Sequence, residues 1–414
     1  MSTYTIIAGL IFLAAIFGYL NARFLKLPTT IGLMLITLLY TVAVLGLSYF
    51  DDTLLRAEAE LIQGIDFERV LMDYMLSFLL FAGALHTNYD ELKKQGAAIV
   101  AFATLGVVTS TFLIGTLTFY LLQLLGMPVS YVYCLLFGAI ISPTDPIAVL
   151  GILKQARAPK KLEIKIVGES LFNDGVGVVL FLTLFEIADA SQGPIGAVDI
   201  AVLFGQEVFG GLLLGVALGW VAYRLIKSID DFSTEIIITL AAVMGGTVVA
   251  QEFHLSAPLA MVAAGLAIGH DQVRASAMSE TTELYVDKFW ELLDILLNAV
   301  LFVLIGMEML ILTFTGSYLL AGLLAIPIVL LSRHAALWLP VRLFSRKLDF
   351  VPHTHKIITW GGLRGGISIA LALSLAEEMN REMFLVMTYV VVVFSILVQG
   401  LTIERVVRRL LPTA

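Results

Sequence analysis

One apolar stretch, residues 131–153, carries the feature that decides the fold; it reads YVYCLLFGAIISPTDPIAVLGIL. A helix needs about 20 apolar residues to cross the roughly 30 Å of bilayer hydrocarbon, so this stretch is long enough. In its middle, however, Pro143 and Pro146 flank Thr144 and Asp145. The prolines remove two amide donors and push the preceding residues out of helical geometry, so we expect the helix to break there.

This polar insertion has two interpretations. A break at membrane depth frees backbone carbonyls, which suit a desolvated cation, and it is tolerated only where it lines a cavity or is buried in protein. Alternatively, the prolines only kink the helix, and Asp145 caps the start of a new helical segment. The segment by itself leaves both interpretations open.

The composition places the rest of the chain in lipid as well. Of the 414 residues, 59% are hydrophobic and 14% are charged, and the mean hydropathy is +0.96. Soluble proteins are about 45–50% apolar and about 25% charged, so this chain lacks the polar surface that a water-exposed fold needs. The single cysteine, Cys134, excludes a disulfide-rich class, and the net charge of −8 does not suggest a nucleic-acid partner.

Thirteen apolar segments can be distinguished along the chain, with no domain linker between them. They are residues 4–20, 29–48, 70–85, 96–125, 131–153, 162–187, 200–223, 234–250, 257–268, 292–312, 317–339, 357–375 and 383–401. Two of them, 70–85 and 257–268, are short enough to be tilted or half-buried. We therefore predict an all-α polytopic membrane protein with thirteen transmembrane helices, forming a single membrane domain over residues 1–414 and no soluble domain.

The basic residues test this count independently. If loops alternate between the two sides, twenty of the 25 Lys and Arg residues fall on one side and three on the other, while Arg333 and Arg364 lie inside segments. Because cytoplasmic loops carry the excess of Lys and Arg, this asymmetry favours an odd number of spans. We expect an integral plasma (inner) membrane protein whose N-terminus is outside and whose C-terminus is cytoplasmic.

A second polar motif lies in the sixth segment, where residues 168–177 read GESLFNDGVG. At roughly 100° per residue, Glu169 and Asn173 stack on one helix face and Ser170 and Asp174 on a neighbouring face. Oxygen ligands of this kind suit hard cations. The alternative for Glu169 is a solvated position beside Lys165 at an interfacial helix start.

A third motif, WGGLRGG, occupies residues 360–366 in the twelfth segment. Four glycines around an arginine mark a second place where a helix can unwind and backbones can approach closely. The guanidinium of Arg364 needs an anionic partner inside the membrane. The glycines by themselves are equally consistent with tight packing, and an arginine would also serve a pocket for an anionic substrate.

Together the three motifs resemble the signature segments of the NhaP-type sodium/proton antiporters, the electroneutral branch of the monovalent cation/proton antiporters. Their order and spacing agree across nearly the whole chain. The resemblance implies thirteen spans, two inverted repeats, crossed broken helices in spans 5 and 12, and a homodimer in the lipid bilayer. It also implies a mobile core around spans 4–6 and 11–13 that works against a dimerisation domain made by the remaining spans.

The span count supports an inverted repeat on separate grounds. The two breaks lie seven spans apart, and an odd offset places equivalent helices in opposite orientations. Half-helix ends of both signs would then meet at the midplane, where Asp145 is suited to offset positive N-termini and Arg364 negative C-termini.

The resemblance also implies roles for individual residues. Asp174 carries either the cation or the proton with Asn173 beside it, while Asp145, Thr144 and Ser170 help to coordinate, and Glu169 pairs with Arg364. The residues of the helix breaks are Pro143, Pro146, Gly361, Gly362, Gly365 and Gly366. One departure from the family pattern is Gly177, where alanine is more usual.

The function implied is electroneutral exchange of Na⁺ or Li⁺ for H⁺ by alternating access, which contributes to pH homeostasis without enzymatic activity or a cofactor. A potassium/proton exchanger on the same fold is the nearest alternative, because the motifs do not separate the monovalent cations. An intramembrane aspartyl protease could use Asp145 and Asp174 as apposed carboxylates, but the Gly-x-Gly-Asp pattern expected there is absent.

Other charges inside segments are less informative. Arg333 and Glu308 lie in neighbouring segments, and we expect them to form a structural pair. The sequence assigns no role to Glu207 or Asp294.

Overall fold

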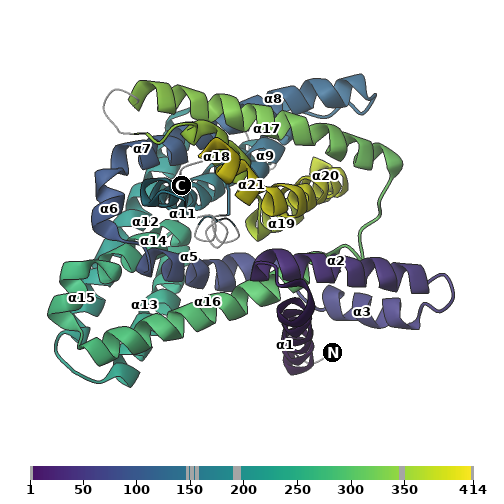
Figure 1. The fold of residues 1–414 in the computed structure, drawn as a ribbon. Coiled ribbons are helices and arrows are strands. Elements are labelled where there is room, and N and C mark those ends of the chain that lie inside the picture. The colour runs from purple at the N-terminus through teal and green to yellow at the C-terminus, as the bar shows by residue number, and fades with distance from the viewer. Residues whose placement is uncertain are drawn as a thin grey trace.

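The computed structural model describes residues 3–145, 149, 153, 158–189, 197–344 and 350–411, and within these ranges helices joined by short connections make up the fold (Figure 1). The first third contains α1 (Thr3–Leu20), α2 (Thr29–Leu47), α3 (Thr53–Gln63), α4 (Phe67–Arg69), α5 (Leu76–Leu85), α6 (Tyr89–Lys94), α7 (Gly96–Ala101), α8 (Val107–Leu124) and α9 (Tyr131–Ile141). Short π-helical turns, η1 (Asn21–Leu25), η2 (Val70–Met75) and η3 (Phe102–Gly106), extend or join these helices.

The remainder begins with the long helix α11 (Lys160–Ala188). It continues with α12 (Ala197–Ile226), α13 (Phe232–Glu252), α14 (Ala257–Gly269), α15 (Asp271–Ala277), α16 (Glu280–Glu308), α17 (Gly316–Phe344), α18 (Thr354–Gly361), α19 (Gly366–Leu373), α20 (Arg381–Phe394) and α21 (Gly400–Leu410). A 3-10 turn, η5 (Glu377–Met379), precedes α20, and a π-helical turn, η6 (Ser395–Gln399), joins α20 to α21.

Each of the thirteen apolar segments contains helix where the structure describes it. Within the described ranges, nine helices are long and apolar enough to cross a membrane, and two shorter apolar helices, Tyr131–Ile141 and Ala257–Gly269, accompany them. Helix α3 was not expected from the hydropathy; it is an amphipathic helix between the second and third segments.

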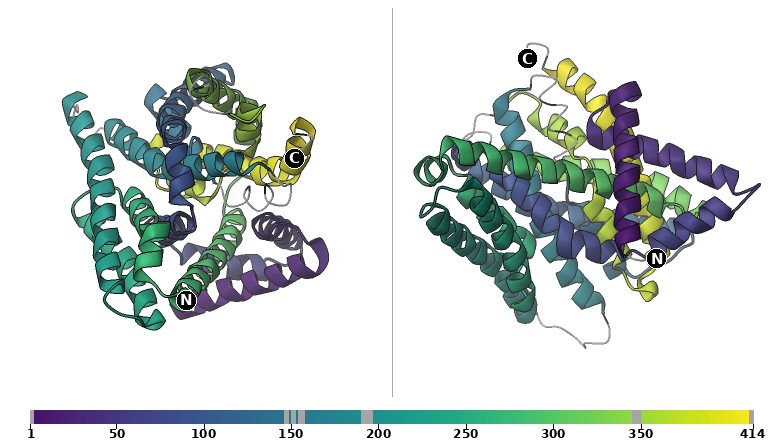
Figure 2. Two further views of the ribbon diagram at one scale, coloured as in Figure 1. Left: turned by 60° about the vertical axis from the view of Figure 1, so that its left-hand side comes forward. Right: turned by 90° about the horizontal axis from the view of Figure 1, so that it is seen from below.

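The central position belongs to α11. In its most apolar window, 67% of the residues are buried inside the protein, compared with 11% for α12. Figures 1 and 2 show α11 between the group α12–α15 on one side and α18–α21 on the other. Because lipid tails are as apolar as leucine, the exposed Phe209, Leu213 and Trp220 of α12 are suited to contact lipid directly.

Two helix interruptions meet in the interior. Helix α9 ends at Ile141, inside the fifth segment, and the chain between α18 and α19 is non-helical from Gly362 to Gly365. The amide of Asp145 donates a hydrogen bond to the carbonyl of Leu363 at 2.8 Å, in an isolated antiparallel bridge. Residues 146–148, 150–152 and 154–157, and therefore Pro146, lie outside the described residues.

Candidate ion-binding site

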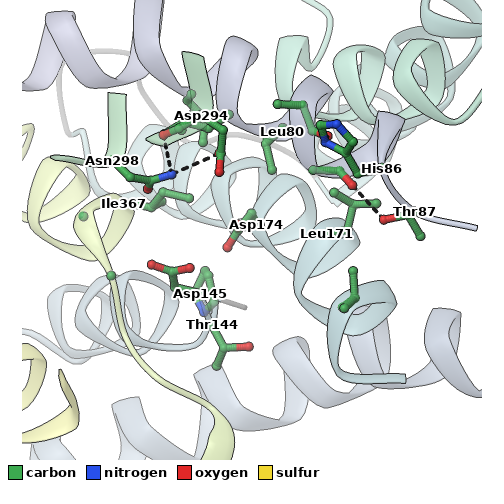
Figure 3. A pocket seen from close by; sticks show the side chains of 18 of the residues that line it. Leu80, His86, Thr87, Thr144, Asp145, Leu171, Asp174, Asp294, Asn298 and Ile367 are labelled. Carbon is green, nitrogen blue, oxygen red and sulfur yellow. Dashed lines mark hydrogen bonds between the residues drawn. The ribbon is translucent and has the colours of Figure 1, made fainter. Parts of the chain in front are cut away.

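A cavity of about 520 Å³ lies beside the two interruptions. Its polar lining includes Thr144 and Asp145 from the first interruption and Asp174 from α11. The exposed side chains of His86 and Lys160 also line it, so the cavity reaches the protein surface at that end. Figure 3 shows the carboxylates of Asp145 and Asp174 facing the same space.

Asp174 is the most isolated charged group of this site. Its side chain is 5% exposed, and it makes no hydrogen bond or ion pair with any other residue that the structure describes. An ionisable group at membrane depth is costly unless a partner offsets its charge. A carboxylate in this position can be neutralised by a proton or by a cation that enters the cavity.

Asn173, Ser170 and Thr144 form a network behind the cavity wall. Asn173 Nδ2 donates to Thr144 Oγ1 at 2.8 Å, and the amide of Thr144 donates to Asn173 Oδ1 at 3.3 Å. The hydroxyls of Thr144 and Ser170 lie 3.2 Å apart. Thr144 lines the cavity, whereas Asn173 and Ser170 do not. The structure thus brings all three residues together, with Asn173 holding the interrupted backbone against α11.

Arg364 caps the broken end of α9. Its Nη1 donates to the carbonyls of Ser142 at 2.6 Å and Pro143 at 2.8 Å, and it also contacts the carbonyl of Ile141. The last carbonyls of a helix have no partner within the helix and carry partial negative charge. A buried guanidinium at this end therefore satisfies carbonyls that the proline break would otherwise leave without donors.

The expected ion pair between Glu169 and Arg364 does not form, because Glu169 pairs with Arg333. Glu169 Oε1 accepts a hydrogen bond from Arg333 Nη2 at 3.0 Å, and the two side chains are 2% and 7% exposed. The expectation that Arg333 pairs with Glu308 is wrong for the same reason. Arg364 instead donates to three backbone carbonyls, whose partial negative charge takes the place of the expected carboxylate.

Three of the four glycines around Arg364 leave room for other parts of the site. A Cβ on Gly362 would overlap the Arg333 guanidinium, one on Gly365 would lie 2.7 Å from Asp145 Oδ2, and one on Gly366 would lie 2.7 Å from Leu301 Cδ1. Gly177 has a similar role in α11, because a Cβ there would overlap the ring of Pro143. These glycines permit the close approach of the two interruptions, α11, α16 and α17.

Gly365 offers a direct test of how Asp145 is positioned. Replacing Gly365 with alanine is expected to displace the Asp145 carboxylate, since a Cβ cannot lie 2.7 Å from an oxygen without a shift. We expect the apparent affinity of the site for a monovalent cation to fall by about tenfold, which corresponds to about 1.4 kcal/mol. The measurement is the cation concentration dependence of the melting temperature of the purified protein.

Gly361→Ala is the matched control, because a Cβ at Gly361 has its nearest neighbour at 3.5 Å, an ordinary van der Waals contact. An equal loss of affinity in both variants would show that helix flexibility, and not the position of Asp145, explains the effect.

The structure brings to the same cavity one polar pair to which the sequence motifs assigned no role. Asp294 and Asn298 of α16 both line it, and Asn298 Nδ2 donates to Asp294 Oδ1 at 3.0 Å and to the Asp294 carbonyl at 2.9 Å (Figure 3). Two polar residues spaced four apart inside an apolar segment could have indicated this pair, because residues with that spacing share a helix face.

Glu308, at the other end of α16, lines a separate cavity of about 530 Å³ together with Arg381. Glu207 is 9% exposed on α12 and does not line either cavity. Neither residue takes part in the site around Asp174.

A helical membrane protein with buried carboxylates on a cavity that reaches one surface, beside interrupted helices, has the features of an ion transporter. Comparison with known proteins specifies which kind. A family model described as "Sodium/hydrogen exchanger, transmembrane" matches residues 11–409, and the chain belongs to this family.

Among its relatives, the Na⁺/H⁺ antiporter NhaP of Pseudomonas aeruginosa is 47% identical over 410 residues, which cover 98% of this chain and 96% of that protein. The Na⁺/H⁺ antiporter NhaH of Halobacillus aidingensis is 33% identical over 94% of this chain and 93% of its own length. The sodium proton antiporter MjNhaP1 of Methanocaldococcus jannaschii has the same fold, with a TM-score of 0.75 at 20% identity, covering 99% of this chain and 100% of that one.

Proposed function

We propose that this protein exchanges Na⁺ or Li⁺ for H⁺ across the membrane, and that Asp174 binds the two ions alternately. The observation that carries this proposal is the position of Asp174, a buried carboxylate on an accessible cavity with no neutralising partner among the described side chains. The names of the relatives, which are Na⁺/H⁺ antiporters, support the choice of ions.

Exchange follows from competition at one carboxylate. Removal from water disfavours the bare anion, so Asp174 is stabilised either by a proton or by a cation but does not hold both. Asp145 and Thr144 supply further oxygens on the same cavity wall, which suits a hard cation. Asn173 and Ser170 hold Thr144 in place, and Arg364 stabilises the broken backbone behind it.

In this proposal the protein works by alternating access. The two interrupted spans cross, and they move with α11 as a core against the remaining spans, which form the interface of a homodimer. The N-terminus lies outside and the C-terminus in the cytoplasm, so the cavity that Lys160 lines opens to the cytoplasmic side.

The direct experiment uses purified protein in vesicles that contain a pH-sensitive dye. Adding Na⁺ or Li⁺ to acid-loaded vesicles is expected to remove the proton gradient, whereas choline leaves it in place. A response to K⁺ alone would replace this proposal with potassium/proton exchange. No response to any monovalent cation would contradict cation/proton exchange altogether.

We expect the exchange to be electroneutral. Asp174 is the one carboxylate that changes its proton in each cycle, because Asn173 precedes it where a second acid could stand and Asp145 keeps a fixed charge. Net charge moved across a membrane is worth about 2.3 kcal/mol per elementary charge per 100 mV, so an electrogenic exchanger would respond clearly to voltage.

The stoichiometry is tested by imposing potassium diffusion potentials of both signs with valinomycin while sodium-driven proton flux is followed. The rate and end-point are expected to be independent of the potential. A shift of either with voltage would contradict one-for-one exchange and would implicate Asp145 as a second proton carrier.

A further inference from the structure

The cavity has a second polar face, contributed by α16. Asp294 and Asn298 lie on it, opposite the interruption that carries Asp145, and Figure 3 shows them on the same side of the cavity as each other. Asn298 is 4% exposed, and its amide nitrogen is committed to Asp294. Its Oδ1 is buried and has no hydrogen-bond donor among the residues that the structure describes.

The chemistry of this face matches a cation better than any other ligand. One carboxylate and one amide oxygen without a donor offer only acceptor atoms, and such hard oxygen ligands suit unpolarisable cations. Asn298 Nδ2 fixes the Asp294 carboxylate from within the same helix, which orients both groups before an ion arrives. An anion would find no free donor on this face, because the amide nitrogen of Asn298 is already bonded to Asp294.

The charge of the whole cavity also favours a cation. Asp145, Asp174 and Asp294 all line it, whereas the described basic side chains on its wall, His86 and Lys160, are exposed at the surface end. A narrow cleft lined by one sign of charge raises the local concentration of counter-ions and their rate of binding by about 10- to 1,000-fold.

The two faces belong to different parts of the fold. Asp174 lies on α11, and Asp145 follows the end of α9. Helix α16 packs mainly against α1, α2, α5 and α13, and less extensively against α19. A cation bound by Asp294 and Asn298 is therefore held by α16, and not by α11, which carries Asp174. Two such faces allow an ion to be received by one group of helices and passed to the other.

We propose that Asp294 and Asn298 form a second binding station for the transported monovalent cation, which receives it from the surface end of the cavity before it reaches Asp174. The proposal rests on the cation exchange proposed above. It assigns to Asp294 the capture of the ion and leaves proton exchange to Asp174.

The first test measures binding without transport. The melting temperature of the purified Asp174→Asn protein is recorded against NaCl concentration, with choline chloride maintaining the ionic strength. Na⁺ is expected to raise it, because a ligand that binds only the folded state stabilises that state. The rise should disappear in Asp174→Asn/Asp294→Asn. Absence of any Na⁺-specific rise in the single variant, or its persistence in the double variant, would overturn the second station.

The second test measures transport by Asp294→Asn with the wild-type Asp174. The KM for Na⁺ is expected to rise by about tenfold, while the maximal rate stays within about twofold of wild type. Asn298→Leu removes the amide oxygen and is expected to raise KM in the same direction. An unchanged KM, whether or not the maximal rate falls, would contradict a receiving station.

Glu207→Gln is the matched control, because Glu207 is another buried carboxylate on a spanning helix but does not line the cavity. It should change neither KM nor the Na⁺-dependent melting. Failure of the exchange proposal is recognised separately, because wild-type vesicles would then show no cation-driven proton flux, whatever the binding test shows.

Discussion

Replacing Asp174 with asparagine is expected to abolish exchange while the protein still folds. An amide has nearly the volume of the carboxylate but neither titrates nor balances the charge of a cation, so both halves of the cycle are lost. We expect the rate of exchange to fall to that of protein-free vesicles, because an intramembrane carboxylate of this kind marks the ion pathway. The measurement is Na⁺-driven proton flux in vesicles, normalised to the amount of folded protein.

The fold should tolerate this change for a specific reason. Asp174 has no hydrogen bond or ion pair with another described residue, so its substitution breaks no contact that holds α11 in place. The elution profile and melting temperature in choline are therefore expected to match the wild type. Exchange that persists above about a tenth of the wild-type rate would remove Asp174 from the centre of the mechanism.

The largest expected effect on stability concerns Glu169 and Arg333. Both side chains are less than 10% exposed and joined at 3.0 Å. Removing one partner of a buried ion pair leaves an uncompensated charge and destabilises by about 3–5 kcal/mol, whereas removing both is less damaging. We therefore expect Glu169→Ala and Arg333→Ala each to lower the melting temperature strongly, and Glu169→Ala/Arg333→Ala to lose less than the sum of the two.

A second double-mutant cycle, of Glu169 with Arg364, distinguishes the observed pair Glu169–Arg333 from the pair Glu169–Arg364. Glu169→Ala and Arg364→Ala should be coupled more weakly, because Glu169 bonds directly to Arg333 while Arg364 is held by carbonyls of Ser142 and Pro143. Coupling between Glu169 and Arg364 that exceeds the coupling between Glu169 and Arg333 would contradict the pairing in the structure. The exposed pair of Lys288 and Glu291 serves as the control and should contribute no measurable stability.

The sequence does not show which arginine pairs with Glu169. Arg333 and Arg364 are both intramembrane cations, and Glu169 alone gives no reason to prefer one of them. The decision depends on how α17 packs beside α18 and on Gly362, whose missing side chain leaves the space that the Arg333 guanidinium occupies. Such a contact between distant segments leaves no periodic signal in either of them.

The local features, by contrast, were determined by the chain itself. Apolar length specified helices for the bilayer, because backbone groups in lipid must be satisfied within the helix. Pro143 and the glycines near Arg364 specified two interruptions, and α9 does end at Ile141 and α18 at Gly361. These outcomes depend on steric and hydrogen-bonding properties of a few neighbouring residues, so they can be read without the tertiary fold.

Only the tertiary structure decided which polar groups share one cavity. It joined the interruptions through Asp145 and Leu363, turned Asn173 towards Thr144, and brought Asp294 to the cavity that Asp174 lines. Helical periodicity defines the face on which a residue lies, but not the helix that this face meets. That depends on close packing between segments far apart in sequence, where the space left by a glycine or filled by a guanidinium selects the neighbour.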